Sequence, residues 1–285
     1  MEDEKHQAIR TQIYYLSPLP IYRTQKPYYI NFPVADPDVP QHNVCHRRYG
    51  DVLMHDIRER EDAFDLDTQG FKLTRHCTSM TNGEFENDRV IRAKYYPEII
   101  DLITRVLGAA QVFPFEHTHR LANSAVEGCG RDRKRKPLTA AHIDQTARAS
   151  ENRVRYHMGE QADELLKGRY QIVNIWRPLF GPLRDFPLCL GDFRTFDLDR
   201  DAEPTDLVFP HFVGESMNLY QHPNHTWYFA SDQMRDEVWM LKCFDSKDGV
   251  AKAAPHCSFD IQNGSFKERP RESVEVRCLV FYGAE

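Results

Sequence analysis

The feature that most constrains the fold is a series of short apolar segments in the second half of the chain. They are rich in valine, isoleucine, leucine and aromatic residues, and Pro, Gly, Asn or Asp stands between them. Short segments of this composition, bounded by turn-forming residues, are typical of β-strands. The series comprises RYQIVNIWRPL, FPLCLGDF, DLVFP, ESMNLYQ, TWYFA, DEVWMLKCF and ESVEVRCLVFY. So many short strands in one half of a chain favour a sandwich or a barrel.

Two other stretches have the period of a helix. Apolar residues recur near every 3.6 positions over residues 88–110, which predicts a helix with one buried face. Pro97 lies inside this stretch and predicts a kink or a break. Residues 150–168 predict a second helix, with Ser150 as its N-cap and Gly168 as its C-terminal stop. We therefore predict a mainly β fold with flanking helices.

The length of 285 residues suits one large domain or two small ones. We expect one domain over residues 1–285. Residues 1–110 would form an N-terminal extension with the packing helix, and residues 111–285 would form the β core.

Composition and charge exclude several classes of protein. The net charge of -6 argues against a nucleic-acid partner, and no apolar run approaches the length of a membrane span. The charged N-terminus MEDEKHQAIR has no apolar stretch typical of a secretory signal. None of the seven cysteines forms a Cys-x-x-Cys pair, which excludes a compact zinc-thiolate site and fits reduced thiols. We expect a cytoplasmic protein without a membrane partner, and the oligomeric state stays open.

A His-x-Asp pair, His142 and Asp144, is the first candidate for a metal site. Such a pair is weak by itself, because 13 His and 43 acidic residues produce about two by chance. In a strand, however, residues i and i+2 point to the same face, so an imidazole and a carboxylate can approach one point. A mononuclear iron(II) oxygenase uses two histidines and one carboxylate, and leaves the remaining positions of the metal open.

The C-terminal region supplies candidates for the rest of such a site. His256, in AAPHCSFDIQNG, lies between a predicted strand and the last one, and can be the second histidine. Arg271 and Ser273 open the alternating last strand, RESVEVRCLVFY. An arginine there can form a bidentate pair with a carboxylate inside the mouth of a barrel.

The order His-x-Asp, distant His and Arg-x-Ser resembles that of the 2-oxoglutarate-dependent iron oxygenases. More narrowly, the chain resembles the hydroxylase/desaturase family that includes fungal AsaB-like enzymes, the gibberellin GA4 desaturase and the cephalosporin methoxylation component CmcJ. The segments that carry the resemblance are PLTAAHIDQT, YQIVNIWRPL, FPLCLGDFR, YFASDQMRDEVWMLKCFDS, PHCSF and RPRESVEVRCLVF, in the family's order. The resemblance implies a double-stranded β-helix, a cupin-like jelly roll, for residues 111–285.

The resemblance also implies roles for single residues. His142, Asp144 and His256 match the iron ligands. Arg271 matches the arginine that grips the far carboxylate of 2-oxoglutarate, and Ser273 matches a residue that assists it.

The gap between the histidine and the arginine is longer than is usual in the family. Arg269 and Arg277 are therefore rivals of Arg271, which we prefer because Ser273 follows it by two residues.

Four further residues can be interpreted either as pocket residues or as structural ones. In a strand, Asn174 and Trp176 share one face and Arg177 takes the other. Any of the three can line the cosubstrate or substrate pocket, as can Tyr228, but each also suits a buried structural role.

The pair His117 and His119 would suit a cupin metal site only with a glutamate four or five residues further on. Asn123 and Ser124 stand there instead, so we expect no metal role for this pair.

The resemblance implies an Fe(II)/2-oxoglutarate-dependent dioxygenase that uses O2 and acts on a small molecule of secondary metabolism. Hydroxylation, desaturation and ring closure all remain open as outcomes. Two other classes remain as alternatives. One is a β-barrel binding protein that has lost turnover, and the other is a metal-dependent hydrolase with the same three ligands.

Overall fold

A computed structural model describes residues 8–122, 136–261 and 269–283 of the chain. Its strands are β1 (Ile9–Leu16), β2 (Tyr28–Ile30), β3 (His46–Asp56), β4 (Phe71–Arg75), β5 (Gln111–Leu121), β6 (His142–Ile143), β7 (Tyr170–Pro178), β8 (Leu188–Gly191), β9 (Ala202–Phe209), β10 (Phe212–Leu219), β11 (Trp227–Phe229), β12 (Glu237–Asp245), β13 (His256–Ser258) and β14 (Glu272–Phe281). The α-helices are α1 (Asp88–Val90), α2 (Tyr96–Leu107), α3 (Ala147–Met158), α4 (Ala162–Leu165) and α5 (Leu198–Asp201). A π-helical turn, Ile91–Tyr95, joins α1 to α2, and 3-10 turns lie at Pro20–Arg23, Glu61–Ala63, Gly83–Glu86, Gly159–Gln161 and Phe193–Thr195.

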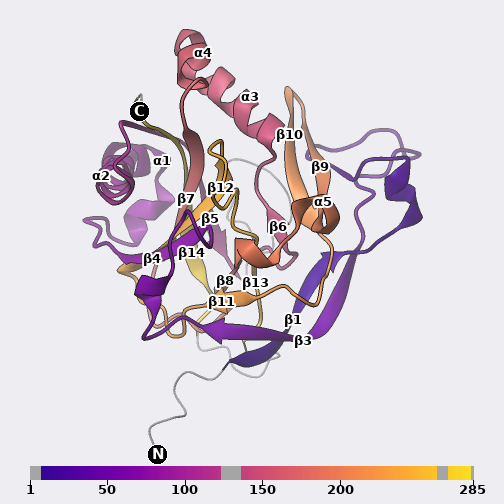
Figure 1. The fold of residues 1–285 in the computed structure, drawn as a ribbon, viewed down its shortest axis with the longest axis horizontal. Helices are drawn as coiled ribbons and strands as arrows, with labels where there is room; N and C mark the ends of the chain where they lie inside the picture. The colour runs from indigo at the N-terminus through magenta and orange to yellow at the C-terminus, as the bar shows by residue number, and fades with distance from the viewer. Residues whose placement is uncertain (1–7, 123–135, 262–268, 284–285) are drawn as a thin grey trace, which may run out of the picture.

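The strands form two facing sheets, so the expected mainly β fold with flanking helices is confirmed (Figure 1). The larger sheet has nine strands in the order β1-β3-β11-β8-β13-β6-β10-β9-β2. The smaller has five in the order β4-β12-β7-β14-β5. The first 110 residues contribute β1, β2 and β3 to the larger sheet and β4 to the edge of the smaller one.

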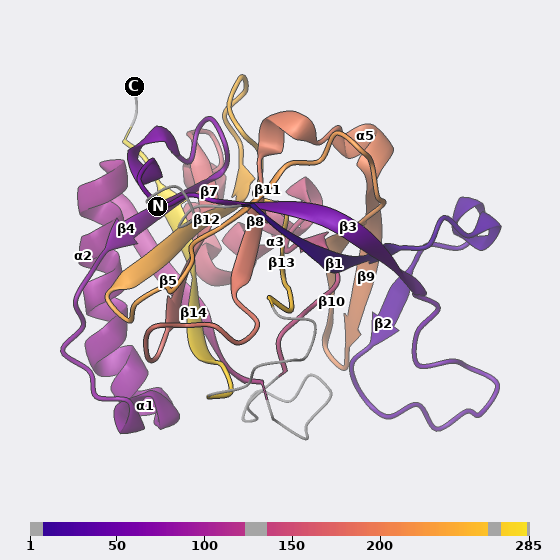
Figure 2. The same ribbon diagram turned by 90° about the horizontal axis from the view of Figure 1, so that it is seen from below.

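Strand β7 is buried on both faces, because it lies in the middle of the smaller sheet. Val173 and Ile175 point outward and pack with Ile99 and Ile103 of α2. Trp176 points inward and packs with residues of the larger sheet, such as Leu190. Figure 2 shows α2 along the outer side of the smaller sheet. The interior between the two sheets is the place left for a site.

The predicted helices are present with different ends. Pro97 does not break the helix: the π-helical turn passes directly into α2, and the backbone of Tyr95 and Tyr96 stays right-handed helical. Pro97 is tolerated because it lies in the first turn of α2. Helix α2 ends at Gly108, whose φ of 65° is the left-handed conformation that glycine adopts readily.

The N-cap expected at Ser150 is wrong. Thr146 caps α3 instead, because its extended backbone lets its side chain accept a hydrogen bond from the Ala149 N–H. The second predicted helix is also divided into α3 and α4, with Gly159 between them at a φ of 55°.

Among the described residues, the structure has no helix that is both long enough and apolar enough to cross a membrane.

Candidate active site

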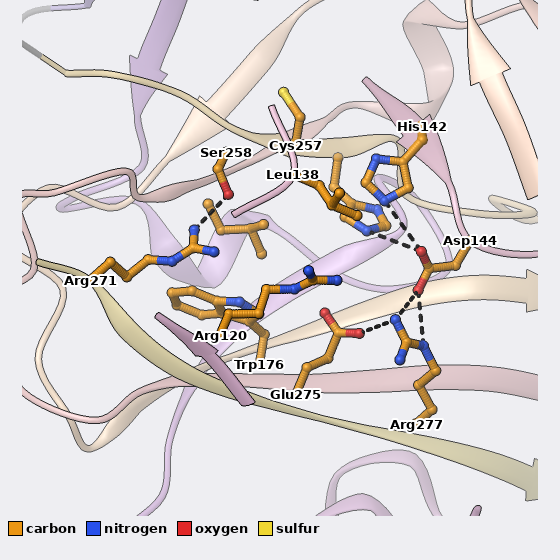
Figure 3. A pocket seen from close by; sticks show the side chains of 12 residues that line it. Arg120, Leu138, His142, Asp144, Trp176, Cys257, Ser258, Arg271, Glu275 and Arg277 are labelled. Atoms are coloured by element: carbon orange, nitrogen blue, oxygen red, sulfur yellow. Dashed lines mark hydrogen bonds and ion pairs between the residues drawn. The ribbon is translucent and has the colours of Figure 1, made fainter. Parts of the chain in front are cut away.

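His142, Asp144 and His256 converge between the two sheets, although 114 residues separate the two histidines in the sequence (Figure 3). Strands β6 and β13 are neighbours, and His142 and His256 are register partners. One Asp144 oxygen, Oδ1, lies 3.3 Å from Nε2 of His142 and 3.7 Å from Nε2 of His256. One ligand atom from each of the three residues lies within 4.8 Å of the others, so the three can hold one metal ion.

The two imidazoles are oriented by their own strands. Nδ1 of His142 lies 2.8 Å from the carbonyl oxygen of Ala140, and Nδ1 of His256 lies 3.0 Å from that of Ala254. Each Nδ1 therefore carries the proton and donates it to a carbonyl, which leaves the Nε2 lone pair for a metal. Burial, followed by the neighbouring His142, lowers the pKa of His256 to about 4, so His256 is neutral near pH 7. Two imidazoles and one carboxylate suit iron(II).

The second oxygen of Asp144, Oδ2, faces the smaller sheet. It accepts hydrogen bonds from Nδ2 of Asn174 at 2.8 Å and from Nη2 and Nε of Arg277 at 3.1 and 3.2 Å. Burial alone would raise the pKa of Asp144, but Arg277, followed by His142 and His256, holds it well below its usual range. The carboxylate is therefore ionised whenever the protein is folded near neutral pH.

Arg271 lies in the same pocket and is 1% exposed. Its Nη1 donates to the carbonyl oxygen of Phe186 at 2.6 Å and to Oγ of Ser258 at 2.5 Å, and its guanidinium lies over the ring of Trp176. Within the described part of the chain, Arg271 has no carboxylate side chain within salt-bridge distance of its guanidinium, and its buried Nε and the Oγ of Ser273 have no hydrogen-bond partner. These are the donors that a bound carboxylate would satisfy.

Burial, followed by the nearby Arg120, lowers the pKa of Arg271 to about 9. Two guanidinium groups near each other in a buried pocket repel, and an anion bound beside Arg271 would relieve this repulsion. The pocket therefore joins a metal-binding group to an anion-binding group, which is the combination that 2-oxoglutarate on iron requires.

The structure brings some of the other predicted residues to this pocket but not all of them. Trp176 lines the pocket. Asn174 does not line it but donates a hydrogen bond to Asp144, which does. Arg177 points to the opposite face of β7, where its Nε donates to the hydroxyl of Tyr95 at 2.8 Å. Tyr228 does not line the pocket and instead packs against aromatic side chains such as that of Phe64.

The rivals of Arg271 have other surroundings. Arg269 is 53% exposed, lies over the ring of Phe180 and approaches Glu272 at 3.8 Å. Arg277 is 11% exposed, but its guanidinium already contacts Asp144.

The histidine pair on β5 lies away from the three converging residues. His117 bonds to the hydroxyl of Tyr96, and His119 bonds to Glu272.

Sequence reasoning missed Glu275 and Arg120, which also line the pocket. The signal for Glu275 was present in the alternation of RESVEVR, because the polar positions 271, 273, 275 and 277 fall on one face of β14. The valines between them pack with α2 on the other face. Arg120 had no comparable signal, since its strand, β5, alternates irregularly.

Comparisons with known proteins agree with this geometry. A family model described as "Oxidoreductase/YMDC permease-like domain" matches residues 13–281. The chain is 35% identical over 253 residues to the hydroxylase/desaturase efuI of Hormonema carpetanum, and the match covers 81% of this chain and 83% of that protein. It is 31% identical to the Fe(II)/2-oxoglutarate-dependent dioxygenase nvfI of Aspergillus novofumigatus, with 81% and 83% covered. It is 26% identical to the gibberellin cluster GA4 desaturase of Gibberella fujikuroi, with 81% and 86% covered.

A solved structure of the iron and alpha-ketoglutarate-dependent endoperoxidase NvfI superposes with a TM-score of 0.84. The superposition covers 97% of this chain and 99% of that one, at 28% sequence identity. The expected jelly roll is thereby confirmed, as are the expected cofactors Fe(II), 2-oxoglutarate and O2. Fold, family match and sequence identity agree that the chain belongs to the family of Fe(II)/2-oxoglutarate-dependent hydroxylases and desaturases.

Proposed function

We propose that His142, Asp144 and His256 hold the catalytic iron of this oxygenase, and that Arg271 and Ser273 hold the far carboxylate of 2-oxoglutarate. The convergence of the three side chains from β6, β13 and the loop after β6 supports the first assignment. The buried Nε of Arg271 and the buried Oγ of Ser273, which lack a hydrogen-bond partner in the described part of the chain, support the second.

Iron with 2-oxoglutarate and O2 supplies an oxidant that removes hydrogen from a C–H bond, while 2-oxoglutarate becomes succinate and carbon dioxide. The protein's own residues prepare the place for this chemistry. His142 and His256 present Nε2, because a backbone carbonyl holds each Nδ1 proton. Arg271 and Ser273 fix the position of the cosubstrate, and the ring of Trp176 forms an apolar wall beneath Arg271 at that end of the pocket.

The substrate is a small-molecule intermediate of secondary metabolism, and the outcome is hydroxylation, desaturation or ring closure. The named relatives support this range, because they include hydroxylase/desaturases, a desaturase and an endoperoxidase.

The enzyme acts as a single domain in the cytoplasm, without a nucleic-acid or membrane partner. The net charge of -6 argues against a nucleic-acid partner. The pairing of β4 with β12 in the smaller sheet supports a single domain, because it joins the first 110 residues to the rest of the chain.

Iron content and succinate formation from 2-oxoglutarate test the iron assignment against an inactive binding protein and a hydrolase. We expect His256→Ala to lower iron-dependent succinate formation by at least about 100-fold, because removing a ligand costs more than removing one of its supports. The matched control is His211→Ala, since His211 is exposed on the turn between β9 and β10. Normal iron content and turnover in His256→Ala would show that the ligand assignment is wrong, and iron-independent turnover by the unmodified chain would favour a hydrolase.

A further inference from the structure

Arg277 is held in place on all sides. Its Nη2 lies 2.6 Å from Oε1 of Glu275, and its Nη1 donates to Oγ1 of Thr118 at 3.1 Å. Its Nε and Nη2 both point at Oδ2 of Asp144. Every nitrogen of the guanidinium therefore has a partner, and the fork cannot turn toward a ligand in the pocket without breaking these contacts.

The contacts at Asp144 are divided between its two oxygens. Asn174 and Arg277 both donate to Oδ2, and the thiol of Cys243 approaches the same atom at 3.8 Å. All of these groups belong to the smaller sheet, whereas Asp144 follows β6 of the larger one. The other oxygen, Oδ1, lies 3.3 Å from Nε2 of His142 and 3.7 Å from Nε2 of His256.

This division bears on how many positions of a bound metal stay open. A carboxylate with two free oxygens can bind a metal through both. In a six-coordinate iron site, two histidines and one carboxylate oxygen leave three positions, which a chelating 2-oxo acid and O2 would fill. A second carboxylate oxygen on the metal would remove one of them.

We propose that Arg277 is a positioning residue that ties down Oδ2 of Asp144, restricts this ligand to binding through one oxygen, and so keeps open a metal position that 2-oxoglutarate needs. The proposal rests on the proposed iron site. Glu275 supports the arrangement, because its carboxylate balances part of the charge of Arg277 and leaves Asp144 its attraction for the metal.

The test compares unmodified protein, Arg277→Met and Arg277→Lys under anaerobic conditions. Iron stoichiometry is measured first, followed by the visible charge-transfer band that a chelating 2-oxo acid gives with Fe(II), titrated with 2-oxoglutarate. We expect Arg277→Met to bind iron with unchanged stoichiometry but to bind 2-oxoglutarate at least about tenfold more weakly, with a reduced band. Arg277→Lys, which retains one donor and the charge, should lie between the two.

Arg177→Met is the matched control. It also removes a fully buried guanidinium from the smaller sheet, but on the face away from the pocket. Its band and 2-oxoglutarate affinity should match those of the unmodified protein. If Arg277→Met does not fold, Asn174→Leu removes the other nitrogen donor to Oδ2 and should shift both readouts in the same direction.

The possible failures are distinguishable. An unmodified protein that binds no iron contradicts the proposed function and the inference with it. The inference alone is overturned if the unmodified protein gives a normal band and Arg277→Met gives the same band and the same 2-oxoglutarate affinity. The same holds for Asn174→Leu where that variant is used instead. Complete loss of iron from the folded variant also overturns it, because Arg277 would then be needed for metal binding itself.

Discussion

Strand β14 and the residue before it carry two arginines on the same face, Arg271 and Arg277, whose side chains are 1% and 11% exposed but have opposite surroundings. Arg277 meets three carboxylates supplied by the chain: those of Asp144 and Glu275, and, at 3.8 Å, that of Glu116. Among the residues that the structure describes, the guanidinium of Arg271 meets only a carbonyl oxygen, a hydroxyl and the face of an aromatic ring. The two arginines are six positions apart. The guanidinium of Arg277 has carboxylate partners within the protein, whereas that of Arg271 has none among the described residues.

The pKa values follow the same division. Burial alone would lower the pKa of Arg277, but Glu275 and then Asp144 raise it well above its usual range. At Arg271 burial dominates, and the nearby Arg120 lowers the pKa further, to about 9. A buried cation with internal partners belongs to the scaffold of the site. A buried cation without them is maintained at a cost in stability, which a bound anion would offset.

The largest contrast we expect is in the stability of the metal-free protein. Arg277→Met leaves two buried carboxylates without their cation and should lower the free energy of unfolding by about 3–5 kcal/mol. Arg271→Met replaces a buried charge that has no carboxylate partner, so the change should stay within about 1 kcal/mol. Urea unfolding at neutral pH measures both. Equal losses in the two variants would mean that Arg271 is as well paired as Arg277, and would end the comparison.

For the affinity for 2-oxoglutarate we expect the reverse order, with a larger effect of Arg271→Met than of Arg277→Met. Arg271→Met removes the proposed partner of a buried carboxylate, so 2-oxoglutarate should bind the iron-loaded protein about 100-fold more weakly, equivalent to about 2.8 kcal/mol. Isothermal titration without O2 measures the dissociation constant directly.

Arg269→Met is the control for this variant, because Arg269 is half exposed and two residues away in sequence. Its affinity should equal that of the unmodified protein. A large loss in Arg269→Met with none in Arg271→Met would reassign the cosubstrate arginine.

Sequence alone predicted the fold class because the long strands carry their own pattern. The segment RYQIVNIWRPL contains β7, and DEVWMLKCF contains most of β12. The strands that carry the histidines were out of reach, since β6 has two residues and β13 has three, too few to show any period. His142 and His256 were found through their chemical type and their order in the chain, not through the strands that hold them.

Sequence spacing predicted which face of a strand a site residue occupies. It did not predict contacts between residues of the two different sheets. The separation of Asn174 and Trp176 from Arg177 follows from strand alternation, and the structure has this arrangement. The contact of Arg277 with Asp144 joins two sheets across 133 residues, and no local pattern encodes it. For the same reason Arg277 could be considered only as a rival of Arg271, and not as a support of Asp144.

A smaller effect should come from the hydroxyl beside Arg271. The Oγ of Ser273 is buried without a partner in the described residues, so a bound carboxylate would give it one. Ser273→Ala should weaken 2-oxoglutarate binding about fivefold, because one hydrogen bond to a charged group is lost, worth about 1 kcal/mol after desolvation. Stability without ligand should not fall, since the variant removes an unpaired polar atom. Unchanged affinity by titration would remove Ser273 from the cosubstrate site.

The smallest effect should come from Ser258, which contacts the arginine and not the proposed ligand. Its Oγ accepts from Nη1 of Arg271, but the same Nη1 also donates to the carbonyl oxygen of Phe186. Ser258→Ala therefore leaves Arg271 one of its two anchors, and the guanidinium should keep its position with somewhat more freedom. We expect 2-oxoglutarate to bind about twofold more weakly, equivalent to about 0.4 kcal/mol, with the maximal rate of succinate formation unchanged. Titration gives the affinity and saturation kinetics give the rate. A loss as large as that of Arg271→Met would show that Ser258 sets the orientation of the arginine by itself, and that Phe186 contributes nothing to it.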